Sequence, residues 1–201
     1  MTFATDHSAS TDQIGSYPAS NTLRAGSVSW REWLAEADLA FVRRCAQTTR
    51  YGSVGHLAIM ISKLGNGWVY PILLTVILMY VQRNALMILA IAALNATILH
   101  MIYPILKKRF RRRRPFQLDP GLNSLLGTLD EYSFPSGHVM TLSGVLLPVT
   151  LSIPGTALPA LGLILIMGWS RIATAHHFPS DVLVGAVLGV IIASPISSWM
   201  L

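Results

Sequence analysis

Charged residues are scarce in this sequence of 201 residues. Only 12% of them are Asp, Glu, Lys or Arg, whereas 52% are hydrophobic, and the mean hydropathy of +0.52 is too high for an ordinary soluble domain. Cysteine is also nearly absent, because Cys45 stands alone. An intrachain disulfide is therefore excluded, and cysteine usage says nothing about the compartment. The composition favours a membrane protein that forms one bundle.

Acidic residues are few as well, since 15 Lys and Arg stand against 9 Asp and Glu, which gives a net charge of +6. The excess is local, because seven of the fifteen basic residues lie in KKRFRRRR at positions 107–114. Such a cluster beside a span can bind anionic lipid headgroups, form a nucleic-acid patch or determine topology. Residues 1–27 lack apolar periodicity, and they also lack the basic start and apolar core of a signal peptide, so we expect a disordered tail there.

Apolar segments dominate the rest of the chain. Residues 30–51 mix apolar and charged side chains in the pattern of an amphipathic helix on a membrane surface. Residues 55–67 are apolar for too few positions to cross a hydrocarbon core about 30 Å thick, so we expect a short interfacial or re-entrant helix. Five apolar segments follow with tight connections, and we predict a membrane span in each of them: 67–82, 84–106, 138–153, 157–175 and 181–200.

The predicted fold class is therefore all-α, a polytopic transmembrane helix bundle of five spans with amphipathic N-terminal helices, six spans being possible. We divide the chain into a disordered tail (1–27), amphipathic or interfacial helices (28–65) and a transmembrane bundle (66–201). Small residues let membrane helices approach closely. We expect this role for four glycines of the spans: Gly144, Gly162, Gly185 and Gly189.

An arginine, a histidine and an aspartate interrupt the apolar sequence in SRIATAHHFPSDVLVG, residues 170–185. Arg171 ends a predicted span, where a buried cation needs an anion or water. His177 and Asp181 are four residues apart, so a carboxylate at a helix start can accept the second ring N–H of the histidine and raise the nucleophilicity of the other nitrogen. Pro179 favours a helix start at that point. On this segment alone, the alternative is a histidine and an aspartate that merely cap a helix.

Two further motifs lie in the connection that spans residues 107–137. Lys107 and Arg114, which Pro115 follows, could hold a tetrahedral anion from two directions, although an anionic-lipid anchor is the simpler interpretation of an arginine-rich run. In the sequence PSGH, Ser136 can act as an N-cap and Gly137 permits close backbone approach, so that free N–H groups point at a bound anion. His138 stands at the same place, and the alternative here is an ordinary helix start.

Together and in this order, the motifs K-x6-RP, PSGH and SR-x5-H-x3-D resemble those of the type 2 phosphatidic acid phosphatase family, over about residues 66–195. The resemblance implies that His177 attacks phosphorus and that His138 protonates the leaving oxygen. It further implies that Asp181 orients the His177 ring and makes it a stronger nucleophile. It also implies that the phosphoryl oxygens are held by Lys107, Arg114, Arg171, Ser136 and Gly137. His176 is a second candidate nucleophile, but its spacing to the other motif residues favours His177.

The residue chemistry agrees with this resemblance, because phosphoryl transfer needs positive charge around the equatorial oxygens, in-line positioning and a proton for the leaving group. We therefore predict a membrane-embedded lipid phosphatase that uses no metal and no cofactor and binds no nucleic acid. Its substrate would be a polyprenyl diphosphate, phosphatidate or phosphatidylglycerol phosphate. Two alternatives stay open at this point: a lipid phosphotransferase that uses the same site, and a non-catalytic protein that binds anionic lipid.

Two arguments disagree about which side of the membrane the site faces. The family's usual arrangement places it on the periplasmic or extracellular face of a bacterial cytoplasmic membrane. With five spans, however, the basic cluster lies on the same side as the site, and the positive-inside rule would make that side cytoplasmic. Because the motif cations are explained by phosphate binding, we expect the periplasmic arrangement.

Overall fold

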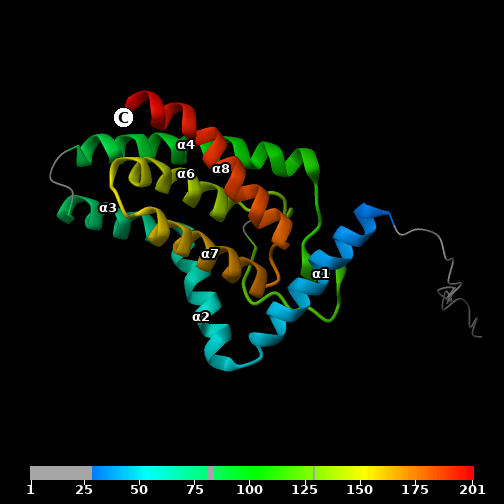
Figure 1. The fold of residues 1–201 in the computed structure, drawn as a ribbon. Helices are drawn as coiled ribbons and strands as arrows, with labels where there is room; N and C mark the ends of the chain where they lie inside the picture. Colours follow the sequence, from blue (N-terminus) through cyan, green and yellow to red (C-terminus); the bar gives the residue numbers. More distant parts are fainter. Residues whose placement is uncertain (1–28, 81–83, 129) are drawn as a thin grey trace, which may run out of the picture.

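The computed structural model describes residues 29–80, 84–128 and 130–201, and every regular element among them is helical (Figure 1). The predicted all-α fold class is thus confirmed, while the predicted tail of residues 1–27 lies outside the described residues. The elements in chain order are α1 (Trp30–Thr48), α2 (Gly52–Lys63), the π-helical turn η1 (Leu64–Trp68), α3 (Val69–Tyr80), α4 (Ala85–Phe110), α5 (Pro115–Leu118), α6 (Gly137–Ser152), α7 (Ala157–Ala173) and α8 (Pro179–Met200).

Three segments are long and apolar enough to cross a membrane: Gly52–Met79, which contains α2 and α3 up to Met79, Ala85–Leu118, which contains α4 and α5, and Pro179–Met200, which is α8. The other two predicted spans correspond to α6 and α7, which are apolar but have only 16 and 17 residues. Large apolar side chains cover the outside of the bundle, for example Leu86 at 77% and Leu158 at 80% exposure. Such a surface needs an apolar surrounding, as in a helical membrane bundle.

Residues 52–79 form two helices that meet at a kink, as predicted from the short apolar segment at 55–67 and the apolar segment that follows it. The first helix comprises α2 and most of η1, the second is α3, and they join at Gly67, whose φ of 134° is not helical. Glycine reaches this region because it has no Cβ. The predicted short helix at 55–67 therefore exists, and it ends at the kink where the next helix begins.

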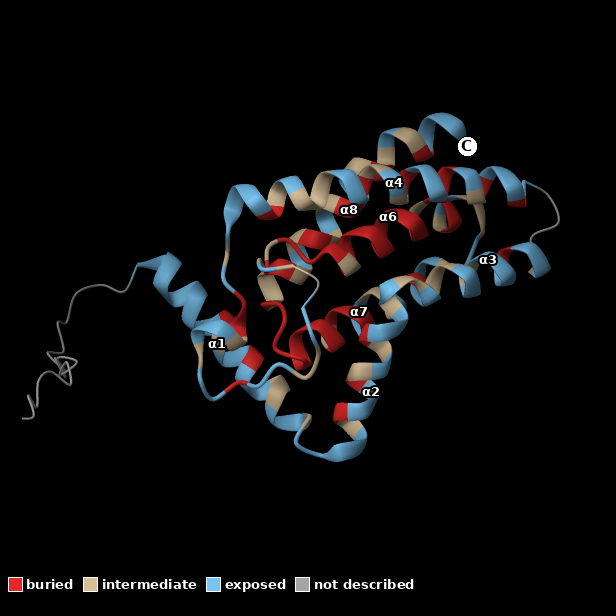
Figure 2. Ribbon diagram, turned by 180° about the vertical axis from the view of Figure 1, so that it is seen from behind, coloured by how far each residue is buried: buried red, intermediate tan, exposed pale blue. Residues whose placement is uncertain are grey.

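Helix α6 forms the centre of the bundle and packs against α4, α7 and α8. Figure 2 shows that most of α6 is buried. A Cβ on Gly144 would lie 2.2 Å from Cδ1 of Leu99, and one on Gly189 would lie 2.2 Å from the carbonyl oxygen of Met140, so both glycines permit the close helix contacts predicted for them. Gly162 faces open space, because its side of α7 meets no neighbouring helix, and the prediction for that position was wrong.

Helix α1 rests against α7 and α8 at the edge of the bundle. It begins at Ser29, whose hydroxyl accepts the backbone N–H of Glu32 while the Glu32 carboxylate accepts the N–H of Ser29. Val42 is fully buried in a cluster with Leu122, Ile172, Ala175 and Phe178. This packing attaches α1 to the loops that surround the motif residues.

Candidate active site

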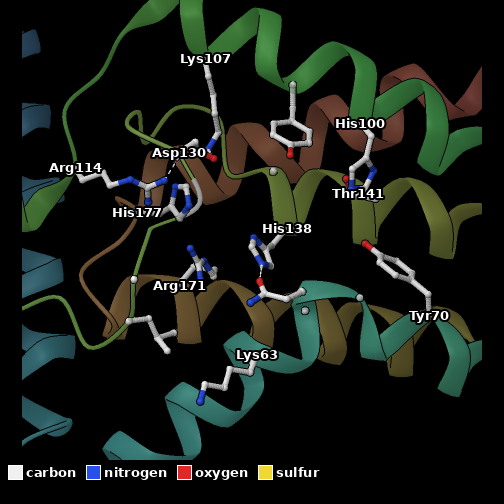
Figure 3. Close-up of a pocket in the computed structure, with 17 residues that line it drawn as sticks. Lys63, Tyr70, His100, Lys107, Arg114, Asp130, His138, Thr141, Arg171 and His177 are labelled. Carbon is white, nitrogen blue, oxygen red and sulfur yellow. Dashed lines mark hydrogen bonds and ion pairs between the residues drawn. The ribbon is translucent and has the colours of Figure 1, made fainter.

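The C-terminal ends of α4 and α7 and the N-terminal ends of α6 and α8 meet around a polar cavity of about 250 Å³ (Figure 3). The motif residues that line this cavity are Lys107, Arg114, Gly137, His138, Arg171 and His177. Ser136 and Asp181 lie directly behind it, and the backbone N–H of Ser136 donates to the Asp181 carbonyl at 3.1 Å. The fold thus brings together every residue that the motifs predicted for the site.

His177 and Asp181 face each other as their spacing predicted. Nδ1 of His177 lies 3.7 Å from Oδ2 of Asp181, and the two side chains are 1% and 0% exposed. This distance is too long for a hydrogen bond, although such contacts commonly shorten when substrate binds. Burial and the charges of Arg171, Arg114 and Lys107 lower the pKa of His177 well below its usual value. The imidazole is therefore neutral at physiological pH, the form in which a nucleophile acts.

His176 is held by other groups through both of its ring nitrogens. Its Nδ1 accepts a hydrogen bond from Nη2 of Arg171 at 2.8 Å, and its Nε2 lies 2.8 Å from Oγ of Ser124 and 3.1 Å from the carbonyl oxygen of Leu126. Burial and the charges of Arg171 and Arg114 lower the pKa of His176 to about 3. His176 therefore positions the Arg171 side chain. Because both of its ring nitrogens have partners, the contacts favour His177 as the attacking group.

Three buried cations converge on the cavity from different segments (Figure 3). Lys107 is 4% exposed and belongs to α4, Arg114 is 2% exposed and precedes α5, and Arg171 is 6% exposed and belongs to the last turn of α7. The α4 helix ends at Phe110, so Arg114 does not lie on the same helix as Lys107. Buried charges are costly unless they are paired, so these residues indicate an anion site.

Asp130 supplies the anion that pairs with two of these cations. Its carboxylate accepts hydrogen bonds from Nζ of Lys107 at 2.8 Å and from Nη2 of Arg114 at 2.6 Å. Burial alone would raise the pKa of Asp130, but the hydrogen bonds and charges of these two residues outweigh burial and lower it. Sequence reasoning missed Asp130, because an acidic residue in an irregular loop has no periodic signal. A phosphate that binds these donors of both cations competes with this carboxylate.

We expect the substitution Asp130→Asn to strengthen binding of inorganic phosphate and vanadate about tenfold. A hydrogen bond to a charged group contributes about 1.5–3 kcal/mol, and about 1.4 kcal/mol corresponds to a tenfold change in affinity. Inhibition constants of the purified protein measure the effect. The matched control is Asp119→Asn, since Asp119 pairs with Arg43 on the surface. Unchanged inhibition constants in Asp130→Asn would show that the carboxylate does not compete with phosphate.

The PSGH motif forms the turn that begins α6. Ser136 occupies the N-cap position, but its hydroxyl makes no cap hydrogen bond and is buried without a partner among the described residues. The first-turn N–H groups of α6 are consequently available to an anion. Gly185 of α8 packs against this turn, where a Cβ would lie 2.8 Å from the Ser136 carbonyl oxygen. That contact fixes the turn beside the His177 segment, and Gly185 has the close-approach role predicted for it.

Arg112 is a further residue that the motifs did not reveal. Its guanidinium donates to Oδ1 of Asp181 at 2.7 Å and to Oδ2 of Asp38 at 2.8 Å, and it lies over the ring of Phe178 at 4.0 Å. Asp38 belongs to α1 and is 6% exposed. The carboxylate behind His177 is thus held by an arginine that is itself anchored on α1.

Comparisons with known proteins agree with this geometry. A family model described as the PAP2 superfamily matches residues 84–201. Decaprenylphosphoryl-5-phosphoribose phosphatase of Mycobacterium tuberculosis (strain H37Rv) is 32% identical over 132 residues, which cover 66% of this chain and 71% of that protein. The protein of the same name from Mycolicibacterium smegmatis is 36% identical over 99 residues, 48% of this chain and 51% of its own length.

Solved structures show the same fold. The crystal structure of Aquifex aeolicus LpxE superposes with a TM-score of 0.64 and 24% identity, covering 81% of this chain and 95% of that one. The crystal structure of a transmembrane PAP2 type phosphatidylglycerolphosphate phosphatase from Bacillus subtilis superposes with a TM-score of 0.62 and 21% identity, covering 83% and 86%. At these identities the likeness is one of fold.

Proposed function

Since this chain belongs to the PAP2 superfamily, a family of lipid phosphatases, we propose that it hydrolyses a phosphate carried by a membrane lipid through a phosphohistidine intermediate. The observation that carries the proposal is the single cavity in which His177, His138 and three buried cations meet. We also propose that the enzyme needs no metal, because these cations and the N–H groups of α6 supply the positive charge that the transferred group requires.

In the proposed first step, Nε2 of His177 attacks phosphorus while Asp181 holds the ring through Nδ1. The bond from phosphorus to the leaving oxygen breaks, its electron pair stays on that oxygen, and the oxygen takes a proton from His138. Water then attacks the phosphohistidine, gives a proton to His138 and releases inorganic phosphate. The oxygens of the transferred group would be held by Lys107, Arg114, Arg171, Ser136 and Gly137.

A lipid substrate is supported by a second, apolar cavity of about 450 Å³ between α3, α4 and α6. Tyr70 lines both this cavity and the polar one, so an apolar chain in the groove would leave its headgroup beside the cations. The names of the mycobacterial relatives favour a phosphate on a polyprenylphosphoryl sugar as the first substrate to test. The active site would face the periplasm of a bacterial cytoplasmic membrane.

The test is a substrate panel assayed with purified protein in detergent, with and without EDTA. The panel contains decaprenylphosphoryl-5-phosphoribose, a polyprenyl diphosphate, phosphatidate and phosphatidylglycerol phosphate. The assay measures free phosphate and any phosphorylated acceptor lipid. We expect free phosphate from at least one lipid at an unchanged rate in EDTA. Phosphate recovered only on an acceptor lipid would identify a phosphotransferase, and activity that EDTA removes and Mg²⁺ restores would refute the metal-free site.

A further inference from the structure

Residues 62–67, which we call the corner between α2 and α3, contact two residues of the active site. Oδ1 of Asn66 lies 2.6 Å from Nε2 of His138, an interaction marked in Figure 3. Nη1 of Arg171 donates to the hydroxyl of Ser62, which is fully buried. The corner therefore touches both the proposed proton donor and one of the phosphate-binding cations.

The glycines of the corner explain how Asn66 reaches the histidine. A Cβ on Gly65 would lie 2.8 Å from Cδ2 of His138 and 2.7 Å from Cε of Met167, so the backbone passes directly against the ring. Gly67 provides the bend with its φ of 134°. The Gly-Asn-Gly sequence thus brings one polar side chain to the Cδ2–Nε2 edge of His138.

The direction of this hydrogen bond determines the proton on the ring. A carbonyl oxygen only accepts, so Nε2 of His138 carries a hydrogen, and the opposite edge with Nδ1 is left for the substrate. The residues matched by the family model begin at 84, so Asn66 lies outside them.

We propose that Asn66 is a positioning residue for His138, an inference that rests on the proposed function. Asn66 accepts the Nε2 hydrogen in both half-reactions, and Nδ1 is the nitrogen that exchanges the catalytic proton. When the bond from phosphorus to the leaving oxygen breaks, that oxygen takes the Nδ1 proton of the imidazolium. His138 is then neutral with hydrogen on Nε2, and its Nδ1 takes a proton from the water that attacks the phosphohistidine.

The test compares Asn66→Leu, which removes the acceptor at similar size, with Asn66→Asp, which keeps an acceptor oxygen. Hydrogen-bond partners that orient metal-ligating histidines typically contribute about 10- to 100-fold, and we expect an effect at the lower end of that range here. We expect Asn66→Leu to lower kcat on phosphatidate about tenfold, with KM unchanged and most of the activity on p-nitrophenyl phosphate retained, because nitrophenolate needs little protonation. Asn66→Asp should retain activity on both. Asn66→Ala replaces the leucine variant if that variant does not fold.

A double-mutant cycle separates positioning from a general structural effect. If Asn66 acts through His138, Asn66→Leu has no further effect on phosphatidate turnover in a His138→Ala background. Equal losses on both substrates, or an additional loss in that background, would overturn the assignment. The parent protein is assayed first on all four lipids of the panel, and its failure to release phosphate from any of them would count against the proposed function and not against the role of Asn66. If it hydrolyses another lipid monophosphate and not phosphatidate, that lipid takes the place of phosphatidate in these comparisons.

Discussion

Replacement of His177 by alanine is expected to abolish phosphate release from every substrate, by roughly 10⁴-fold or more, as removal of a nucleophile does in other hydrolases. The reason is that no phosphohistidine can form without the imidazole, whatever the leaving group. His177 lines the cavity, whereas both ring nitrogens of the neighbouring His176 are held by other groups, so we expect no replacement by His176. Single-turnover phosphate release from the best lipid of the panel measures the effect.

The matched control for this experiment is His176→Ala. His176 holds Arg171 and contacts the Ser124 hydroxyl, so its loss should raise KM and leave a measurable kcat. A His177→Ala variant that keeps turnover, together with a His176→Ala variant that loses it, would exchange the roles of the two histidines.

The second large effect is expected from His138→Ala, and it should depend on the leaving group. A general acid contributes roughly 10²- to 10⁴-fold when the leaving oxygen is basic. The alkoxide that leaves phosphatidate needs the proton, whereas nitrophenolate, or the phosphate that leaves a diphosphate, needs it much less. We therefore expect kcat on phosphatidate to fall by about that factor, with most of the p-nitrophenyl phosphate activity retained and a polyprenyl diphosphate in between.

Initial rates on these three substrates at saturating concentration provide the measurement. The control is His100→Ala, because His100 also lines the cavity but hydrogen-bonds through Nδ1 to the backbone carbonyl of Ala96 on its own helix. Equal losses on all three substrates in His138→Ala would mean that this histidine binds the anion and does not protonate the leaving oxygen.

The motif residues could be located from the sequence because their spacing is a local property. His177 and Asp181 meet across one helix start, and the PSGH turn opens α6 beside them. Hydropathy located the helices for the same reason, because the apolar side chains that face the core or the lipid follow one another along a single segment. The kink at Gly67 coincides with the predicted boundary between the short helix at 55–67 and the first span.

The supporting residues could not be found in this way. Asp130, Arg112 and Asn66 reach the site through contacts between segments that are distant in the sequence, such as the 72 residues between Asn66 and His138. Charge patterning along one segment does not reveal such pairs. Arg112 shows the consequence most clearly, because the sequence assigned it to a basic cluster for lipid or topology, whereas the fold pairs it with Asp38 and Asp181.

If His177 carries the phosphoryl group, a rapid-quench experiment can trap it on the protein. Purified protein is mixed with a lipid substrate labelled with ³²P in the transferred phosphate, and the reaction is stopped within milliseconds with alkali, in which phosphohistidine survives. We expect radioactivity on the peptide that contains His177, its loss on brief acid treatment, and none on the His177→Ala variant. Release of phosphate by the parent protein with no labelled enzyme at any time point would rule out a phosphohistidine intermediate and indicate direct attack by water.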